Sequence, residues 1–317
     1  MLKYLIIPLA DNAVSFCHYF PSLESEKWIP ESTLSQAIVW AMKENVSVQF
    51  VYPTYQLPEE LATIVDTIDH IKIVPWNHSD NEILKYAESV VFDNISDMSN
   101  FDFRANQSYV LRTSFEELRD KIKIISTCLS KVDRLNIVIN NLIDANDRIL
   151  QEYKDSLEEL IPVIVEEFKK GHSVQLNLLT DRLLLKEMNN CNAGEESITL
   201  ASDGKFYVCP AFYVNKDAVV GDLNDGIELK NPQLFKLTHS PICRICDSYQ
   251  CKRCVWLNKK MTREVNTPSR QQCVLAHIER NASKKLLEEC RKIDQSFLKD
   301  TIIEDIDYLD PFDKLMQ

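Results

Sequence analysis

The chain has 317 residues, of which 45% are hydrophobic and 9% aromatic, and its formal net charge is −12. This length allows one large or two medium domains, and the apolar share is enough for a real core. The negative charge argues against a nucleic-acid-binding surface over the whole molecule, so we expect no nucleic-acid partner.

The N-terminal segment is apolar but short. It runs from Met1 to Ala10 and ends at Asp11. That is too short for a membrane span or a signal-peptide core, and the segment has no cleavage-site pattern. We therefore expect a buried strand at residues 4–9, a cytoplasmic location and no membrane partner. In a reducing cytosol, the ten cysteines are expected to be ligands or buried thiols and not disulfides.

Short apolar runs alternate with helical patterns along the first half of the chain. Further strands are expected at 48–52, 71–74, 90–92, 109–111, 135–139 and 174–178. Helices are expected at 31–44, 58–68, 82–88, near 115–130 and at 147–169. The alternation predicts an α/β fold, either a parallel sheet or a partial (β/α) barrel with helices outside. Continuous Val, Ile and Leu runs suit strands that are buried on both faces.

All five glycines lie at or after Gly171. Residues 1–170 therefore lack the glycine-rich loops that bind a dinucleotide or a nucleoside triphosphate, and the glycine turn that exposes a nucleophilic serine. We expect no cofactor-binding residues of those kinds in the N-terminal half.

After about Leu185 the segments shorten. Residues 198–209 predict a hairpin whose turn is Asp203-Gly204, because Asp-Gly favours tight turns. A second turn group spans 221–226, and residues 278–299 resemble a charged helix. The tail from 302 to 317 is acidic and is expected to be a solvated end, although its apolar residues are an alternative means of docking it on the body. Those apolar residues are Ile306, Leu309 and Phe312.

Seven cysteines form the most informative pattern in the chain. They read Cys191-x12-Gly204-x4-Cys209, then Cys243-x2-Cys246-x4-Cys251-x2-Cys254, then Cys273. Thiolates at such spacing can bend round one metal ion or one corner of an iron–sulfur cube, whereas cysteines that only pack follow no spacing rule. The pattern therefore predicts metal or cluster binding. Zinc is the alternative metal, although the middle gap is far shorter than the roughly 15–20 residues of a zinc ribbon.

This pattern resembles the SPASM domain, the auxiliary-cluster module of radical S-adenosylmethionine enzymes that modify ribosomal peptides. The family usually spaces the middle group C-x2-C-x5-C-x3-C, so each of the last two gaps is one residue short here. The resemblance implies up to two 4Fe–4S clusters. One would be held by Cys243, Cys246, Cys251 and Cys273, and the other by Cys191, Cys209 and Cys254. The second set lacks an eighth cysteine, which leaves one iron open to water, to another residue or to a substrate thiolate.

The N-terminal half resembles the same superfamily in its strand–helix rhythm but not in its chemistry. Those enzymes carry C-x3-C-x2-C in the loop after the first strand, whereas this loop has only Cys17, and no register around Cys17 supplies the missing pair. We therefore expect that the chain does not cleave S-adenosylmethionine by itself. Taken whole, with segments such as 14–19 and 48–53, the chain is similar to the CXXX-repeat peptide maturases.

The expected domain organisation follows from this resemblance. Residues 1–185 would form a degenerate radical-SAM-like α/β domain, and residues 186–280 a small cysteine-rich α+β domain of SPASM type. Residues 281–317 would form a C-terminal helix and the acidic tail.

Some other residues have a functional and a packing interpretation. Cys17 and His18 are weak candidates for a catalytic nucleophile pair, because barrel loops usually build active sites, although neighbours on an extended chain point apart. Cys128 is expected to be a core thiol, and Cys290 a packing or surface thiol. His239 and His277 flank the cysteine region as alternatives for the missing ligand. A basic patch beside the cysteines is either a solvated face or a docking surface, and it comprises Lys252, Arg253, Lys259, Lys260 and Arg263.

Two functions compete on this basis. The first is an iron–sulfur peptide-maturation protein, either a maturase or an accessory subunit. It would act on a ribosomally made, cysteine-containing peptide, with a partner maturation enzyme or a redox protein as a further partner. The second is a zinc-stabilised peptide-binding protein without catalysis.

Overall fold

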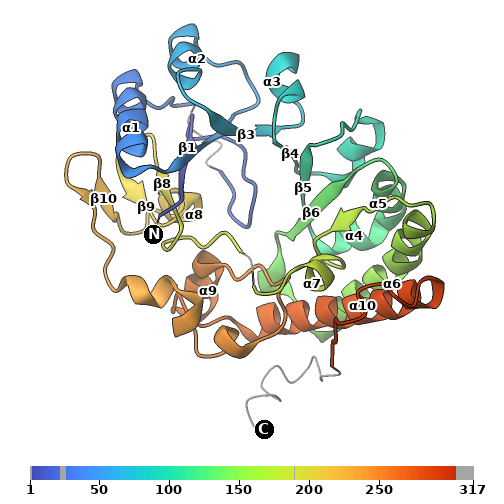
Figure 1. The fold of residues 1–317 in the computed structure, drawn as a ribbon. Coiled ribbons are helices and arrows are strands. Elements are labelled where there is room, and N and C mark those ends of the chain that lie inside the picture. The colour runs from blue at the N-terminus through green and yellow to red at the C-terminus, as the bar shows by residue number, and fades with distance from the viewer. Residues whose placement is uncertain (1, 22–25, 189, 305–317) are drawn as a thin grey trace. The chain divides into compact units, whose positions relative to one another are not determined.

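The computed structural model describes residues 2–21, 26–188 and 190–304, and these fall into two compact units. The first unit comprises the described residues of Met1–Val91 and Cys191–Ser240, and the second those of Phe92–Asn190 and Pro241–Gln317. The predicted acidic tail lies outside the described residues from position 305 onward. Each unit carries part of the parallel strand arrangement (Figure 1).

The first unit is built on parallel strands in the order β4-β3-β2-β1-β8, with β9 antiparallel at the end. The strands are β1 Tyr4–Pro8, β2 Ser47–Val51, β3 His70–Pro75, β4 Ser89–Phe92, β8 Ser197–Leu200 and β9 Phe206–Tyr207. Leu5 on one face of the strands and Ile6 and Val51 on the other are all buried, as expected for parallel strands covered on both faces. The hairpin β8–β9 turns at Gly204, whose φ of 80° lies in the left-handed region that favours glycine.

Short helices accompany these strands. They are α1 Glu31–Glu44, α2 Glu59–Val65, α3 Asn81–Lys85 and α8 Pro210–Val214, with 3-10 turns η3 Pro232–Phe235 and η4 Leu237–His239. The sequence predicted Leu34, Ile38, Ala41 and Met42 on one face of α1; Leu34, Ile38 and Ala41 are buried together with Ala37, whereas Met42 is exposed. Helices α1 and α2 lie side by side along the strands (Figure 1). A small hairpin joins β10 Gly221–Asp222 to β11 Gly226–Ile227.

The second unit carries the parallel strands β5 Ser108–Thr113, β6 Arg134–Ile139 and β7 Gln175–Leu176. Its α-helices are α4 Phe115–Asp120, α5 Ile122–Leu129, α6 Asp147–Lys169, α7 Asp181–Leu184, α9 Val255–Thr262 and α10 Arg270–Ile293. Its 3-10 turns are η1 Ile95–Asn100, η2 Leu142–Asp144 and η5 Cys243–Ile245. The two long helices α6 and α10 pack along each other (Figure 1).

The predicted α/β fold with mostly parallel strands is confirmed, but two helices differ from the prediction. The helix expected near 115–130 is two helices that meet at Lys121, which caps the end of one and the start of the next. The helix expected at 278–299 spans 270–293 instead and crosses the domain boundary predicted at 280/281. It starts early because Ser269 and Gln272 form a reciprocal capping box that satisfies the first backbone amides.

Among the described helices, none combines the length and the apolar character that crossing a bilayer requires.

Candidate metal centre

Four of the seven pattern cysteines line one small cavity in the second unit. They are Cys243, Cys246, Cys251 and Cys273, the set predicted for the first cluster. His277, Arg253, Gln272 and Met188 are among the other residues that line this cavity, which we call the thiol cavity. None of the described cysteines forms a disulfide.

The chain brings these thiols together through one turn, one loop and one helix. Cys243 begins η5, and the amide of Cys246 donates to the carbonyl of Cys243 at 3.2 Å. In the loop that follows, the amide of Cys251 donates to Ser248 O at 2.9 Å. Cys273 lies in the first turn of α10, just after the capping box. Local turn bonds and a helix start therefore present all four side chains to the same space.

Burial and the charges of neighbouring cysteines raise the pKa of two of these thiols, Cys251 and Cys273. The pKa of Cys251 is raised well above its usual value, first by burial and then by the negative charges of Cys243, Cys246 and Cys273. Burial also raises the pKa of Cys273 to about 12, and the charges of Cys243 and Cys246 add to this. Thiolates here therefore need a nearby cation. A metal bound in the cavity would supply one, because metal binding releases the thiol protons.

The described residues contain no group of three or more His, Cys, Asp or Glu side chains arranged to hold a single metal ion. Thiolates that bind different irons of one cube lie further apart than thiolates that share one ion. The four cysteines that line the thiol cavity are the donor type that iron–sulfur cubes use, and their binding of a cluster stays a prediction.

A buried ion network lies beside the cysteine loop. Asp247, the residue after Cys246, accepts hydrogen bonds from Arg280 Nε at 2.8 Å and Arg280 Nη2 at 2.7 Å. Arg182 Nη2 reaches the same carboxylate at 3.2 Å, and its guanidinium stacks on the Tyr249 ring at 4.5 Å. Two cations against one anion leave positive charge next to the cavity, which suits an anionic thiolate cluster. Sequence reasoning missed this network, because 33 and 65 residues separate its partners.

A buried carboxyl group also lies near the cysteine loop. Glu279 on α10 accepts a hydrogen bond from Tyr153 Oη of α6 at 2.8 Å. Burial raises the pKa of Glu279 to about 7, and hydrogen bonds from Tyr153 and Gln250 partly oppose this rise. The charge of Glu279 also raises the pKa of Cys251. No sequence pattern singled out Glu279, since one acidic residue on a charged helix normally faces solvent.

The second predicted ligand set is divided between the units. Cys191 and Cys209 belong to the first unit, where Cys191 is exposed and Cys209 is buried as the residue before α8. Cys254 belongs to the second unit and caps α9, its sulfur accepting from the Leu257 amide at 3.4 Å. A site formed by these three therefore stays a prediction.

The loop after β1 holds the weak catalytic candidates and a polar cluster. Cys17 and His18 are half-buried, and their pairing as a nucleophile and a base stays a prediction. Earlier in this loop, Asp11 accepts hydrogen bonds from Tyr213 Oη at 2.8 Å and from Ser202 Oγ. These contacts tie the loop to the segment around α8. In the sequence, only the position of Asp11 directly after the first apolar run could have indicated a functional role for this residue.

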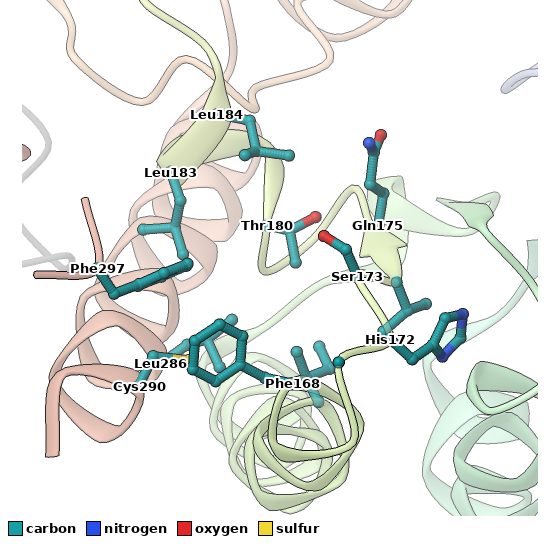
Figure 2. Close-up of a pocket in the computed structure, with 13 residues that line it drawn as sticks. Phe168, His172, Ser173, Gln175, Thr180, Leu183, Leu184, Leu286, Cys290 and Phe297 are labelled. Atoms are coloured by element: carbon teal, nitrogen blue, oxygen red, sulfur yellow. The ribbon is translucent and has the colours of Figure 1, made fainter. Parts of the chain in front are cut away.

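The remaining cysteines lie in apolar surroundings, as predicted for packing thiols. Cys128 is buried on α5, and burial raises its pKa. Cys290 lines a separate cavity of about 190 Å³. Figure 2 shows it beside Leu286, with the rings of Phe168 and Phe297 close by; the ring centroids lie 4.8 Å apart. Burial raises the pKa of Cys290 as well. The apolar surroundings of Cys128 and Cys290 favour the neutral thiol, so they do not favour either residue as a thiolate ligand.

The predicted basic patch is smaller than expected. Arg253 is only 2% exposed and lines the thiol cavity, so it does not belong to a surface patch. Lys252, Lys260 and Arg263 are exposed and Lys259 is half-buried. Lys260 lies over the Trp256 ring at 4.9 Å. The patch therefore consists of the C-terminal half of α9 and its flanks.

Comparison with known proteins places the fold. No protein-family model matches the chain, and no curated protein is similar to it in sequence. Among solved structures, the anaerobic sulfatase-maturating radical SAM enzyme anSMEcpe with bound AdoMet matches with a TM-score of 0.62 at 14% identity, over 93% of this chain and 100% of that one. The same enzyme with AdoMet and the Cp18Cys peptide gives 0.61 at 14% identity, over 92% and 99%.

A third similar structure is Streptococcus suis SuiB bound to S-adenosylmethionine, with a TM-score of 0.51 at 12% identity, over 84% of this chain and 76% of that one. The chain thus has the fold of radical SAM enzymes that mature proteins and peptides. The predicted likeness in fold is confirmed, and membership of the radical SAM superfamily stays a prediction. The SPASM-like character of the cysteine-rich part stays a prediction.

Proposed function

We propose that this chain is an iron–sulfur peptide-maturation protein, a maturase or the accessory subunit of one, without a cluster of its own that cleaves S-adenosylmethionine. The observation that carries the proposal is the thiol cavity, in which four cysteines of one pattern meet and in which burial and mutual charge oppose thiolates without a cation. The fold supports it, because the similar structures include an enzyme solved with a bound peptide.

The fit between the thiol cavity and a cluster rests on its donors and charges. Cys243, Cys246, Cys251 and Cys273 would hold one 4Fe–4S cluster, and the positive excess at Arg182, Arg280 and Asp247 would offset its negative charge. When bound, such a cluster supplies one-electron redox chemistry and a binding point for soft ligands. The η5 turn, the loop after it and α10 would orient the sulfurs toward the cluster.

The lack of S-adenosylmethionine cleavage follows from the loop after β1. That loop offers Cys17 as its one cysteine, whereas the reductive chemistry needs three thiolates on one cube with one iron left open. We infer that the radical step, if the pathway uses one, belongs to a partner enzyme.

The proposed substrate is a ribosomally made peptide with cysteines. The predicted second ligand set, Cys191, Cys209 and Cys254, is one cysteine short of a complete four-thiolate site, and thiolate is a ligand that iron favours. A peptide cysteine would complete it. Peptides commonly bind α/β domains by main-chain pairing at an exposed strand edge, which would hold such a cysteine in place.

A peptide titration tests this proposal. The anaerobically reconstituted protein is titrated with the cysteine-containing peptide encoded beside its gene and, as the matched control, with a Cys→Ser version of that peptide. We expect tighter binding of the cysteine peptide and a change of the cluster spectrum with that peptide alone. Equal binding with unchanged spectra would remove the open-iron role, and binding of both peptides to a zinc-loaded protein would favour the zinc-stabilised alternative.

A further inference from the structure

His277 is the one imidazole among the described residues that line the thiol cavity. It follows Cys273 by four residues on α10, so both side chains project from the same helix face. The capping box at Ser269 and Gln272 fixes where this helix starts, and the Gln272 amide also bonds Asn258 Oδ1 of α9 at 3.0 Å. The His277 side chain is 4% exposed. Its place in the cavity is therefore set by the helix and not by a mobile loop.

The sulfur of Cys246 lies within hydrogen-bond range of this imidazole. His277 Nε2 lies 3.7 Å from Cys246 Sγ, within hydrogen-bond range for sulfur. The backbone amide of Ser248 donates to the same sulfur at 3.5 Å. Cys246 thus faces two nitrogens, one from its own loop and one from α10. Within the described part of the chain, the sulfurs of Cys251 and Cys273 have no such hydrogen bond.

We propose that His277 is a positioning residue for the cluster of the thiol cavity, donating Nε2–H to the Cys246 thiolate and raising the reduction potential. The inference rests on the proposed iron–sulfur function. A hydrogen bond to a ligating sulfur draws negative charge away from it, which stabilises the reduced, more negative cluster. The bond also fixes the imidazole tautomer that carries its proton on Nε2.

Two substitutions separate the donor role from simple packing. His277→Gln keeps an N–H donor on a side chain of similar reach, and His277→Leu fills the space without one. His172→Gln is the matched control, because the His172 ring contacts Glu167 at 2.9 Å and lines the separate cavity that contains Cys290. Each protein is reconstituted anaerobically. Its iron and sulfide content is measured, and its midpoint potential is determined by redox titration followed by electron paramagnetic resonance.

We expect His277→Leu to shift the midpoint potential to a more negative value while iron and sulfide stay at the wild-type level. His277→Gln should reverse part of that shift, and His172→Gln should leave the potential unchanged. Thermal unfolding of each holo-protein shows whether the Leu variant is folded. If the Leu variant is unfolded, two other measurements decide whether His277 is a donor. They are the midpoint potential of the His277→Gln variant and the nitrogen coupling in the electron paramagnetic resonance spectrum of the wild-type cluster.

Three results would overturn the inference. Equal potentials in wild type and both His277 variants would show that the bond has no effect on the cluster. Loss of iron in both variants, or a strong directly bonded ¹⁴N coupling in the wild type, would make His277 a ligand and not a donor. A wild-type protein that binds zinc and no cluster would overturn the proposed function itself, and the inference with it.

Discussion

At the scale of single residues, Cys251 is the thiol that most needs a bound cation. It is buried in the thiol cavity and is repelled by the charges of three neighbouring cysteines. We expect Cys251→Ser to lose the iron and sulfide of this site and to lower solubility, because small metal modules fold around their metal. The measurement is metal analysis of anaerobically purified protein.

Cys128→Ala is the matched control for that substitution. Cys128 is also a buried thiol, but it lies on α5 against Met98 O, away from the pattern cysteines. This variant should keep the wild-type iron content. A Cys251→Ser protein with full iron would contradict the assignment of Cys251 as a ligand.

Glu279 predicts a pH dependence of stability. Its pKa is about 7 in the folded protein, whereas the ordinary value of a glutamate, which applies to the unfolded chain, is 4.5. Between these values the folded state binds more protons than the unfolded state, so stability falls as the pH rises through this window. Above the pKa of Glu279 in the folded protein, the free energy of unfolding is lowered by its full amount, which is at most about 3 kcal/mol.

Glu279→Gln should remove this loss of stability, because a neutral amide does not ionise. The amide oxygen can still accept the hydrogen bond from Tyr153 Oη. We expect the variant to gain stability over wild type at pH 8 and to show little difference at pH 5. Urea unfolding at the two pH values checks this. A gain of the same size at both would mean that the carboxyl does not titrate across this window.

At the scale of elements, Asp247 joins the cysteine loop to α7 and α10. Its carboxylate is the shared partner of Arg182 and Arg280, of which Arg280 is completely buried. Asp247→Asn would leave two buried cations without their anion, so we expect a loss of about 3–5 kcal/mol in the free energy of unfolding.

The matched control is Glu289→Gln, which removes the exposed ion pair with Lys292 on the same helix. It should cost less than about 0.5 kcal/mol. Equal effects of the two substitutions on the urea midpoint would show that the Asp247 network does not hold the loop on α10.

At the scale of the whole molecule, the strand–helix order was predictable from local patterns. Strand β1 lies in a continuous apolar run and is buried from Leu5 to Pro8, and the helix predicted at 147–169 matches α6. The start of α10 was missed because a polar capping box precedes its apolar face. The four cysteines of the thiol cavity were predicted together from spacing and resemblance.

Long-range contacts account for what the sequence did not reveal. Arg253 was assigned to a surface patch, although it is buried in the thiol cavity. The pairing of Asp247 with Arg182 and Arg280, and of Glu279 with Tyr153, joins residues between 33 and 126 positions apart. Charged residues at such separations carry no periodic signal, so only the folded chain shows which of them are buried and paired.

The fold and the missing cysteines together predict how the whole chain treats S-adenosylmethionine. The fold is that of radical SAM enzymes, but the loop after β1 has one cysteine where they need three. We expect no 5′-deoxyadenosine when the pure, reconstituted protein is incubated with S-adenosylmethionine and a strong reductant. Product formation above a no-enzyme control, abolished by Cys17→Ala, would refute this expectation.

The most direct measurement is the metal content of the protein purified and reconstituted without oxygen. Iron, acid-labile sulfide and zinc are determined together on one sample, with Cys246→Ser beside the wild type. We expect a brown wild-type protein with iron and sulfide in equal amounts, and a large loss of both in the variant. Stoichiometric zinc without iron or sulfide in the wild type would contradict this expectation.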